Sequence, residues 1–376
     1  MKWEKVKLGN VTDSCLGKML DQNKNKGDYQ PYLANVNVRW GEFDLEDLPL
    51  MKFEESEQER YELKYGDLVI CEGGEPGRCA IWKEQIPNMK IQKALHRVRV
   101  HDCIDYRYLF YWFLLAGKTG ELDQYFTGAT IKHMPGQKLK EVVIDKPPLE
   151  IQHRIADILS AYDDLIENNQ KQIKLLKEAA QRLYKEWFVD LHFPGHENTK
   201  IVDGVPEGWR RGLLKELISV NYGKDHKKVP DDGNIPVYGS GGLMRKCNKS
   251  LFFGEAVLIP RKGSLNNIMY VDETFWTVDT MFYATMKQPH TAVFVYFFVK
   301  AFDMYSMNIG AAVPSMTTKI LDAMDVVIPD KETLEKFDKY AKVYFNKIKT
   351  LQGQNEQLKT ARDLLLPKLM SGEVEV

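Results

Sequence analysis

The stretch PPLEIQHRIADILSAYDDLIENNQKQIKLLKEAAQRLYKEWF, residues Pro147–Phe188, decides the fold. Its apolar residues recur at alternating steps of three and four, which is the narrow stripe of a coiled-coil seam rather than the wide face of a surface helix. The spacing predicts one long helix from about Leu149 to Phe188. The predicted seam residues are Ile155, Ile158, Tyr162, Leu165, Leu176, Leu183 and Trp187.

A second stretch with the same spacing closes the chain and predicts a helix from about Leu334 to Met370. One asparagine interrupts each stripe, Asn169 in the first and Asn355 in the second. A buried asparagine in a seam lowers stability but fixes register and partner choice. The alternative is two ordinary amphipathic helices, each packed on its own domain. The second seam comprises Leu334, Phe337, Ala341, Tyr344, Ile348, Leu351, Leu358 and Leu365. We expect helix pairing to depend on Asn169, Leu176, Leu183, Ile348, Asn355 and Leu358.

The segments around the two helices are also repeated in the same order. Each copy has a Gly-led apolar run, then an aromatic-rich helix candidate, then a closing segment with a Val-Val-Ile strand. In the first copy these are GDLVICEGGEPGRCAIW (66–82), YRYLFYWFLLAG (106–117) and FTGATIKHMPGQKLKEVVIDKPPLE (126–150). In the second they are residues 254–271, 292–302 and 308–335, the last opening with a matching Gly310–Ala311. A period of roughly 180 residues indicates a duplicated domain-plus-helix unit, because solenoid repeats are much shorter.

Two copies of one unit can pack like a twofold dimer, which makes their helices antiparallel. We therefore expect an α+β protein with two globular domains at opposite ends of an antiparallel coiled coil. The expected segments are a first domain (1–148), a central helical spacer (149–192), a second domain (193–330) and a C-terminal helical spacer (331–376). Residues 191–208 are polar and linker-like.

Composition limits the class of protein. The chain has 376 residues, a formal net charge of −1 and no apolar run of membrane-spanning length, so a cytoplasmic protein without membrane contact is expected. Near-neutral charge counts against a generic electrostatic DNA binder, unless basic residues are segregated to one face. The acidic run EESEQERYE, residues 54–62, could be a displaced acidic patch.

Catalytic signatures are absent from the sequence. There is no GxxxxGK[ST] phosphate loop, HExxH, GxSxG or zinc-deaminase signature. The five cysteines are scattered without zinc-ligand spacing, and the eight histidines are dispersed. We therefore predict neither catalytic residues nor a metal site in this chain.

The loops offer cationic and hydrogen-bonding side chains on Gly-rich turns. Such groups can bond guanine edges, phosphates and adenine. For any single residue, solvated surface is the alternative. Arg78 follows the GGEPG loop, and Arg261 and Lys262 are expected at the same place in the second copy. The predicted DNA-binding residues are Arg39, Arg78, Lys132, His133, Lys224, Lys227, Lys228, Ser240, Arg245, Arg261, Lys262, Ser315, Thr317 and Lys319.

Taken together, the chain resembles the specificity subunits of type I restriction-modification systems over essentially its whole length. YLANVNVRWGEFDL and residues 66–82 look like a first target recognition domain, GVPEGWR like the entry to the second, and ARDLLLPKLMSGEVEV like the closing helix and tail. The resemblance implies a non-catalytic DNA-reading subunit that binds a bipartite double-stranded site, two methyltransferase subunits and motor-nuclease subunits. It also implies that S-adenosylmethionine, ATP and Mg²⁺ are used by those partners for adenine methylation and translocation.

Two functions of other classes remain open from the sequence. One is a coiled-coil scaffold that joins two protein-binding domains without touching DNA, which near-neutral charge favours. The other is an enzyme with its own nuclease site, although no clustered set of acidic residues and a lysine lies in a convincing strand context. Paired Gly-rich basic loops favour the DNA-reading subunit.

Overall fold

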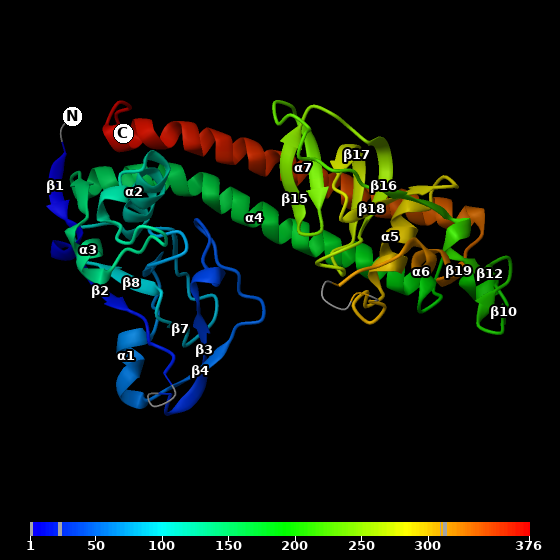
Figure 1. Ribbon diagram of the computed structural model, residues 1–376, viewed down its shortest axis with the longest axis horizontal. Helices are drawn as coiled ribbons and strands as arrows, with labels where there is room; N and C mark the ends of the chain where they lie inside the picture. The colour runs from blue at the N-terminus through cyan, green and yellow to red at the C-terminus, as the bar shows by residue number, and fades with distance from the viewer. Residues whose placement is uncertain (1–2, 22–24, 309, 311–313) are drawn as a thin grey trace. The chain divides into compact units, whose positions relative to one another are not determined.

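The computed structural model of the chain describes residues 3–21, 25–308, 310 and 314–376 (Figure 1). It divides into two compact units, residues 1–168 with 354–376 (unit 1) and residues 169–353 (unit 2). Two long helices, α4 (Leu149–Phe188) and α7 (Lys331–Ser371), each contribute one half to each unit. The long helix predicted from the first seam therefore exists with the expected bounds. None of the helices in the described residues is long and apolar enough to cross a membrane.

Unit 1 holds three small sheets and a buried helix. The strand orders are β2-β8-β5-β6, β4-β3-β7 and β1-β9. The strands are β1 (Glu4–Lys7), β2 (Thr12–Leu16), β3 (Asp28–Leu33), β4 (Leu50–Phe53), β5 (Leu68–Cys71), β6 (Cys79–Ile81), β7 (Lys90–Ile91), β8 (Leu95–Val100) and β9 (Val143–Lys146). The helices are η1 (Leu8–Asn10), η2 (Asn35–Asn37), η3 (Glu55–Glu57), α1 (Gln58–Tyr61), α2 (Tyr106–Thr119), η4 (Asp123–Tyr125) and α3 (Gly136–Glu141).

Unit 2 is built around one larger sheet. Its strand order is β13-β18-β16-β17-β14-β15, and β12-β19 and β10-β11 form separate pairs. The strands are β10 (Ile201–Val202), β11 (Val205–Pro206), β12 (Arg210–Leu213), β13 (Ile218–Tyr222), β14 (Ile235–Gly239), β15 (Gly242–Cys247), β16 (Phe252–Pro260), β17 (Met269–Thr277), β18 (Met281–Met286) and β19 (Asp325–Ile328). The helices are η5 (His196–Asn198), η6 (Leu214–Glu216), α5 (Ala292–Lys300) and α6 (Thr318–Asp322).

The two units repeat one topology. The order β2-β8-β5-β6 in unit 1 corresponds to β13-β18-β16-β17 in unit 2, and the pair β1-β9 corresponds to β12-β19. The backbone bond from Leu8 N to Val142 O, at 2.7 Å, has its counterpart from Leu214 N to Met324 O, at 2.9 Å. The aromatic-rich helices α2 and α5 are largely buried, as their composition predicts. The duplicated unit inferred from the sequence is confirmed, except that Ala311 of the predicted Gly-Ala match lies outside the described residues.

The tryptophans that precede β1 and β12 each contact a long helix. Trp3 Nε1 donates to the carbonyl of Met370, near the C-terminal end of α7, at 3.2 Å. Trp209 Nε1 donates to Asp330 at 3.0 Å, and its ring packs 5.7 Å from that of Phe188 at the end of α4. Equivalent tryptophans therefore anchor each block to the end of a long helix.

The helix α7 begins three residues before the predicted Leu334 because Asp330 caps it. The Asp330 carboxylate accepts from the backbone N–H of Thr333 at 3.0 Å and from the Thr333 hydroxyl at 2.7 Å. Such a cap satisfies backbone donors that have no partner inside the helix. Burial acts to raise the pKa of Asp330, but the hydrogen bonds from Thr333 and Trp209 outweigh it and hold that pKa below its usual value. The carboxylate is therefore ionised and available as a cap.

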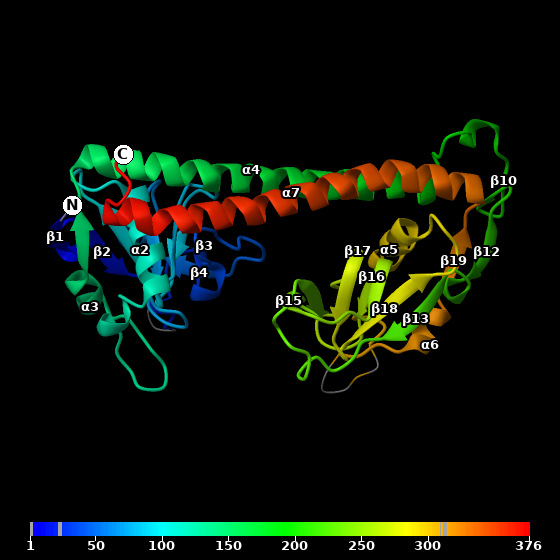
Figure 2. The same cartoon turned by 90° about the horizontal axis from the view of Figure 1, so that it is seen from above.

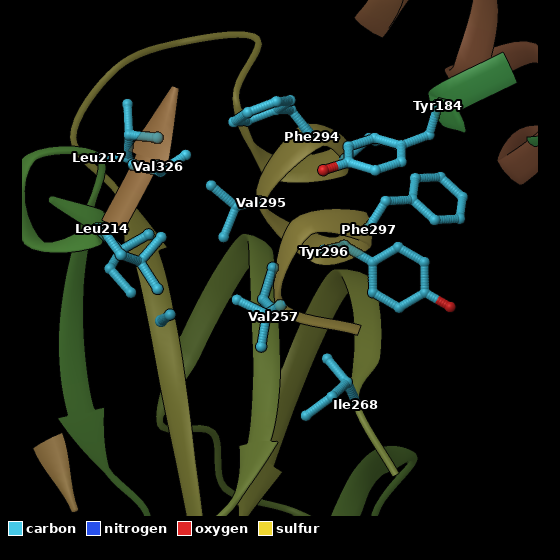
Figure 3. Packing of buried hydrophobic residues seen from close by; sticks show 14 of the residues in the cluster. Tyr184, Leu214, Leu217, Val257, Ile268, Phe294, Val295, Tyr296, Phe297 and Val326 are labelled. Atoms are coloured by element: carbon cyan, nitrogen blue, oxygen red, sulfur yellow. The ribbon is translucent and has the colours of Figure 1, made fainter. Parts of the chain in front are cut away.

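Each globular core is completed by both long helices, which run antiparallel within each unit (Figure 2). In unit 2, the rings of Tyr184 and Trp187 from α4 lie 6.3 and 5.8 Å from that of Phe337 on α7. The ring centre of Tyr184 also lies 5.4 Å from that of Phe297 of α5. Figure 3 shows these two side chains next to each other. Full burial of one such side chain stabilises the fold by about 1.5–3 kcal/mol.

Unit 1 adds a polar network to its apolar helix contacts. Ile155 and Leu159 of α4 share a buried cluster with Leu366 and Leu369 of α7. Beside this cluster Asp163 of α4 pairs with Arg362 of α7, and the Tyr111 hydroxyl donates to Asp163 at 2.6 Å. Burial, reinforced by the Asp163 carboxylate, raises the pKa of Tyr111, so the phenol stays protonated as a donor.

The predicted seam of α4 is wrong at two positions in unit 1. Ile158 is 36% exposed and Leu165 51% exposed, whereas the next residue in each case is buried, Leu159 at 0% and Ile166 at 6%. This half of α4 packs on the globular block as well as on α7. Its buried face therefore includes residues beside the stripe that would be buried if α4 contacted α7 alone. Asn169 is buried as predicted, at 8% exposure.

The predicted α7 seam is confirmed by its burial. Asn355 is 7% exposed, and the apolar seam positions are buried or half-buried.

The linker-like interpretation of residues 191–208 was incomplete, because the segment contains η5 and the β10-β11 hairpin. Phe193 within it is buried and packs 4.8 Å from the Trp209 ring. Phe193, together with the half-buried Leu191 and Val205, therefore ties this polar segment to the unit 2 core.

The corrected seam can be tested with adjacent residues. Leu159→Ala should lower the free energy of unfolding of unit 1 by about 2–5 kcal/mol, because it leaves a cavity in a buried cluster. Ile158→Ala should lower it by less than Leu159→Ala does, because the Ile158 side chain is 36% exposed and alanine favours helix. Urea unfolding measures both. Equal losses, or a larger loss for Ile158→Ala, would contradict the assignment.

Candidate nucleic-acid interface

Three loops of unit 1 meet at one place. They are residues 34–40 after β3, residues 72–78 between β5 and β6, and residues 127–134 before α3. A backbone bridge joins Gly73 to His133, and Met134 N donates to Glu72 O at 2.7 Å. The carbonyl of Asn35 accepts from Arg78 Nη2 at 3.0 Å. The structure therefore places on one set of contacting loops the predicted site residues Arg39, Arg78, Lys132 and His133.

Gly73 lies where the second and third loops approach each other closely. A Cβ at this position would lie 2.9 Å from Nδ1 of His133, so a side chain here would have to displace the exposed His133 ring. Below the loops His96 is 1% exposed, and its Nε2 lies 2.9 Å from the carbonyl oxygen of Met134. Burial lowers the pKa of His96, so the neutral ring donates to that carbonyl and supports the loop.

Unit 2 has the same loop arrangement with different side chains. A bridge joins Lys262 to Ser315, and Met316 N donates to Arg261 O at 2.9 Å. The carbonyl of Ser240, after β14, accepts from Asn267 Nδ2 at 2.8 Å. Ser240, Arg261, Lys262 and Ser315 therefore form a cluster equivalent to that of unit 1.

These contacts correct the predicted correspondence between the two copies. The bonds to Met134 and Met316 make Arg261 the counterpart of Glu72, and the two bridges make Lys262 the counterpart of Gly73. Arg261 and Lys262 therefore do not occupy the place of Arg78. Asn267 is instead the counterpart of Arg78. Arg78 donates to the backbone carbonyl of Asn35, which follows β3, and Asn267 donates to that of Ser240, which follows β14. The sequence hid this because the matching side chains differ in type.

A second group of lysines lies on residues 223–229, which follow β13. The indole of Trp276 donates to the carbonyl of Lys224 at 3.1 Å, and Lys224 N donates to the carbonyl of Thr277 at 2.9 Å. The nearby carbonyl of Thr280 accepts from the backbone of Arg261 at 2.8 Å and of Lys262 at 3.1 Å. Residues 277–281 thus support both the lysine loop and the loop cluster of unit 2.

The predicted residues differ in how far their polar groups are already used. Arg245 donates from Nη2 to the carbonyls of His226 and Val229, at 2.6 and 2.9 Å, and so holds the lysine loop. Arg78 is similarly engaged, with a further bond to Glu75 at 2.9 Å. The Thr317 hydroxyl accepts from Ile320 N at 3.4 Å as the cap of α6. These three side chains position loops.

Other predicted residues present charge to solvent. Lys132 is 56% exposed, with Nζ 3.5 Å from Asp123 and 5.6 Å from the Phe126 ring centre. The Arg261 guanidinium lies 5.4 Å from the centre of the Tyr222 ring. Arg39 is exposed, although Nη1 bonds the carbonyl of Val36. The remaining exposed predicted residues are His133, Lys224, Lys227, Lys228, Lys262 and Lys319.

The chemistry of both clusters is that of hydrogen bonding and positive charge. Within the described ranges, no group of three or more His, Cys, Asp or Glu side chains could hold a metal ion. Exposed lysines and arginines beside backbone amides suit phosphate oxygens and base edges. Tyr222, Asn35 and Asn267 belong to the clusters but were not identified from the sequence, because isolated Tyr and Asn residues carry no pattern.

The division between positioning and exposed residues can be tested by one pair of variants. Arg245→Ala should lower the melting temperature, because it leaves loop carbonyls without donors at a cost of about 1–3 kcal/mol. Lys228→Ala should leave stability within about 0.5 kcal/mol of wild type but weaken retention of duplex DNA. Thermal unfolding and gel shifts measure the two effects. A destabilising Lys228→Ala with a neutral Arg245→Ala would overturn the division.

Comparison with known proteins places the chain in a family. The family described as "Type I restriction modification DNA specificity domain" matches residues 1–178 and 206–360, one match for each globular block and most of the long helix after it. The chain is 27% identical over 352 residues to the Type I restriction enzyme MjaIX specificity subunit of Methanocaldococcus jannaschii, covering 83% of this chain and 78% of that protein.

Two further comparisons span nearly the whole chain. The MjaVIII specificity subunit of the same organism is 24% identical over 414 residues, covering 100% of this chain and 93% of that protein. The crystal structure of a type I restriction-modification S subunit from M. genitalium shares the fold, with a TM-score of 0.59 and 18% identity over 98% of this chain and 96% of that one. The chain therefore belongs to the family of type I restriction-modification specificity subunits.

Proposed function

We propose that each unit reads one half of a bipartite site in duplex DNA, and that the chain itself is non-catalytic. The observation that carries this proposal is the repeated loop cluster with different side chains at equivalent places. Gly73 and His133 in unit 1 correspond to Lys262 and Ser315 in unit 2. The two clusters have matching backbone contacts but carry different donors and charges. This suits two domains that recognise different base sequences, because side chains that contact base edges determine specificity.

The chemistry and motor functions belong to partners in this proposal. Two methyltransferase subunits would use S-adenosylmethionine, and motor-nuclease subunits would use ATP and Mg²⁺, in a cytoplasmic complex. The long helices would dock the methyltransferase subunits. Ile158 and Leu165 support this docking role, because they are exposed apolar side chains seven residues apart on α4. Such side chains, two turns apart on one helix face, suit contact with a partner helix.

Exchange of one recognition block tests the two-reader proposal. Replacing residues 1–146 with those of another specificity subunit should change only one half of the methylated motif. The matched exchange of residues 206–330 should change only the other half. Methylome sequencing of cells that carry each chimera gives the motif. Simultaneous change of both halves in either chimera would show that the units do not read separately.

Single substitutions test the clusters themselves. Lys132→Ala and Arg261→Ala should each weaken binding to the native duplex by about 1–3 kcal/mol if the contact is to a base. If the contact is to a phosphate, the substitution should instead weaken binding to all duplexes alike. The slope of log affinity against log salt concentration should then fall in magnitude by about 0.9 per lost contact. Lys174→Ala, at an exposed position on α4, is the control. Unchanged affinity for both cluster variants would remove these residues from the interface.

The helices are also proposed to set the gap between the half-sites. One heptad added to both α4 and α7 preserves the seam and lengthens each by about 10 Å, or roughly three base pairs. The added pairs rotate one half-site by around 100° relative to the other, so the native site should be lost. A regained site should keep both halves and lengthen the unread gap, as methylome sequencing would reveal. An unchanged gap would show that the helices do not set the spacing.

A further inference from the structure

A cleft in unit 2 is lined by lysines that lack carboxylate partners. The cleft has a volume of ≈ 380 Å³ and lies where α4, α5, β17 and α7 meet. Lys177 of α4, Lys300 of α5 and Lys349 of α7 line it. Lys300 Nζ donates to the Tyr296 hydroxyl at 3.0 Å, and Lys349 Nζ donates to a backbone carbonyl at 2.7 Å. Among the described residues, none of the three ammonium groups forms an ion pair.

Two of these charges repel each other. Lys177 has neither an ion pair nor a side-chain hydrogen bond with the residues that the structure describes. Burial of its ammonium group lowers the pKa of Lys177, and the positive charge of Lys300 lowers that pKa further. Like charges held close together are destabilising, and an anion between them would remove the repulsion.

The rest of the lining is compatible with an anion. The amides of Asn267, Asn346 and Gln352 can act as donors. The lining also holds two opposing carboxylates, Asp272 and Glu273, and Glu273 accepts from the Tyr238 hydroxyl at 2.6 Å. Three lysines against two acidic residues leave the lining with an excess of positive charge.

We propose that this cleft binds a phosphate group between Lys177, Lys300 and Lys349. A lysine ammonium group is a compact charge with several donors, which suits phosphate oxygens approached from different directions. The three groups come from three different helices and line one cleft. A volume of ≈ 380 Å³ is in the range of about 300–1,000 Å³ that small-ligand sites occupy.

The phosphate can come from either of two sources. Asn267 lines the cleft and also holds the Ser240 carbonyl in the loop cluster, so the cleft adjoins the candidate DNA-reading surface. A phosphate of the duplex backbone would reach it from that surface, and this source rests on the proposed function. A free nucleotide or pyrophosphate is the other source and does not depend on DNA reading.

The test uses the full chain, inorganic pyrophosphate and an unrelated duplex at fixed ionic strength. Calorimetry measures pyrophosphate binding, and gel shifts over a salt series measure the duplex. Lys177→Gln should weaken binding roughly tenfold, the loss expected for one charged hydrogen bond. Lys174→Gln, one turn away and outside the lining, should have no effect. Asp272→Asn should strengthen binding, because it removes one of the two opposing charges.

Each outcome has a defined meaning. Pyrophosphate binding that Lys177→Gln weakens supports the site and a free phosphate as its source. Loss of duplex affinity alone in Lys177→Gln, with a salt dependence reduced by about 0.9, supports a backbone phosphate. No effect of Lys177→Gln on either ligand, or an equal effect of Lys174→Gln, overturns the proposal. A wild-type chain that binds pyrophosphate but no duplex would contradict the proposed function and leave this site intact.

Discussion

Neither globular block closes its hydrophobic core with its own residues, and the rest of the structure depends on this constraint. In unit 2 the core needs Trp187 from α4 and Phe337 from α7, and in unit 1 it needs Leu159 from α4 and Leu366 from α7. The apolar stripes of the long helices are therefore shared between pairing with each other and completing the blocks. A substitution in either helix therefore alters the packing beneath the sheets that carry the loop clusters.

The near-neutral net charge of the chain says little about where its charges lie. Part of the acidic run pairs with buried lysines in unit 1. Glu57 pairs with Lys18, and Glu62 with Lys90, each at 2.5 Å, and both lysines are buried. The acidic run at residues 54–62 thus supports unit 1 instead of merely balancing the total charge. Net charge conceals the separation between internal pairs and the exposed lysines of the loops.

Sequence periodicity was sufficient to predict α4, the duplicated unit and the buried asparagines, because these depend on local spacing and on order along the chain. It failed at Ile158 and Leu165, where contact with a block as well as a helix turns the buried face. It also failed to identify Asn267 as the counterpart of Arg78. These two residues correspond because each donates a hydrogen bond to the same backbone carbonyl position in its unit. Three-dimensional contacts between distant loops leave no pattern in one sequence. The roles of the predicted DNA-binding residues stay predictions.

In the proposed function, one chain carries two separate readers of DNA. The most direct measurement is a map of N6-methyladenine across the genome, in cells that express the methyltransferase partner, with this gene present and deleted. We expect methylation that depends on the gene and falls in a motif with two specified blocks separated by unspecified bases. A motif with a single continuous block, or methylation unaffected by deletion of the gene, would contradict it.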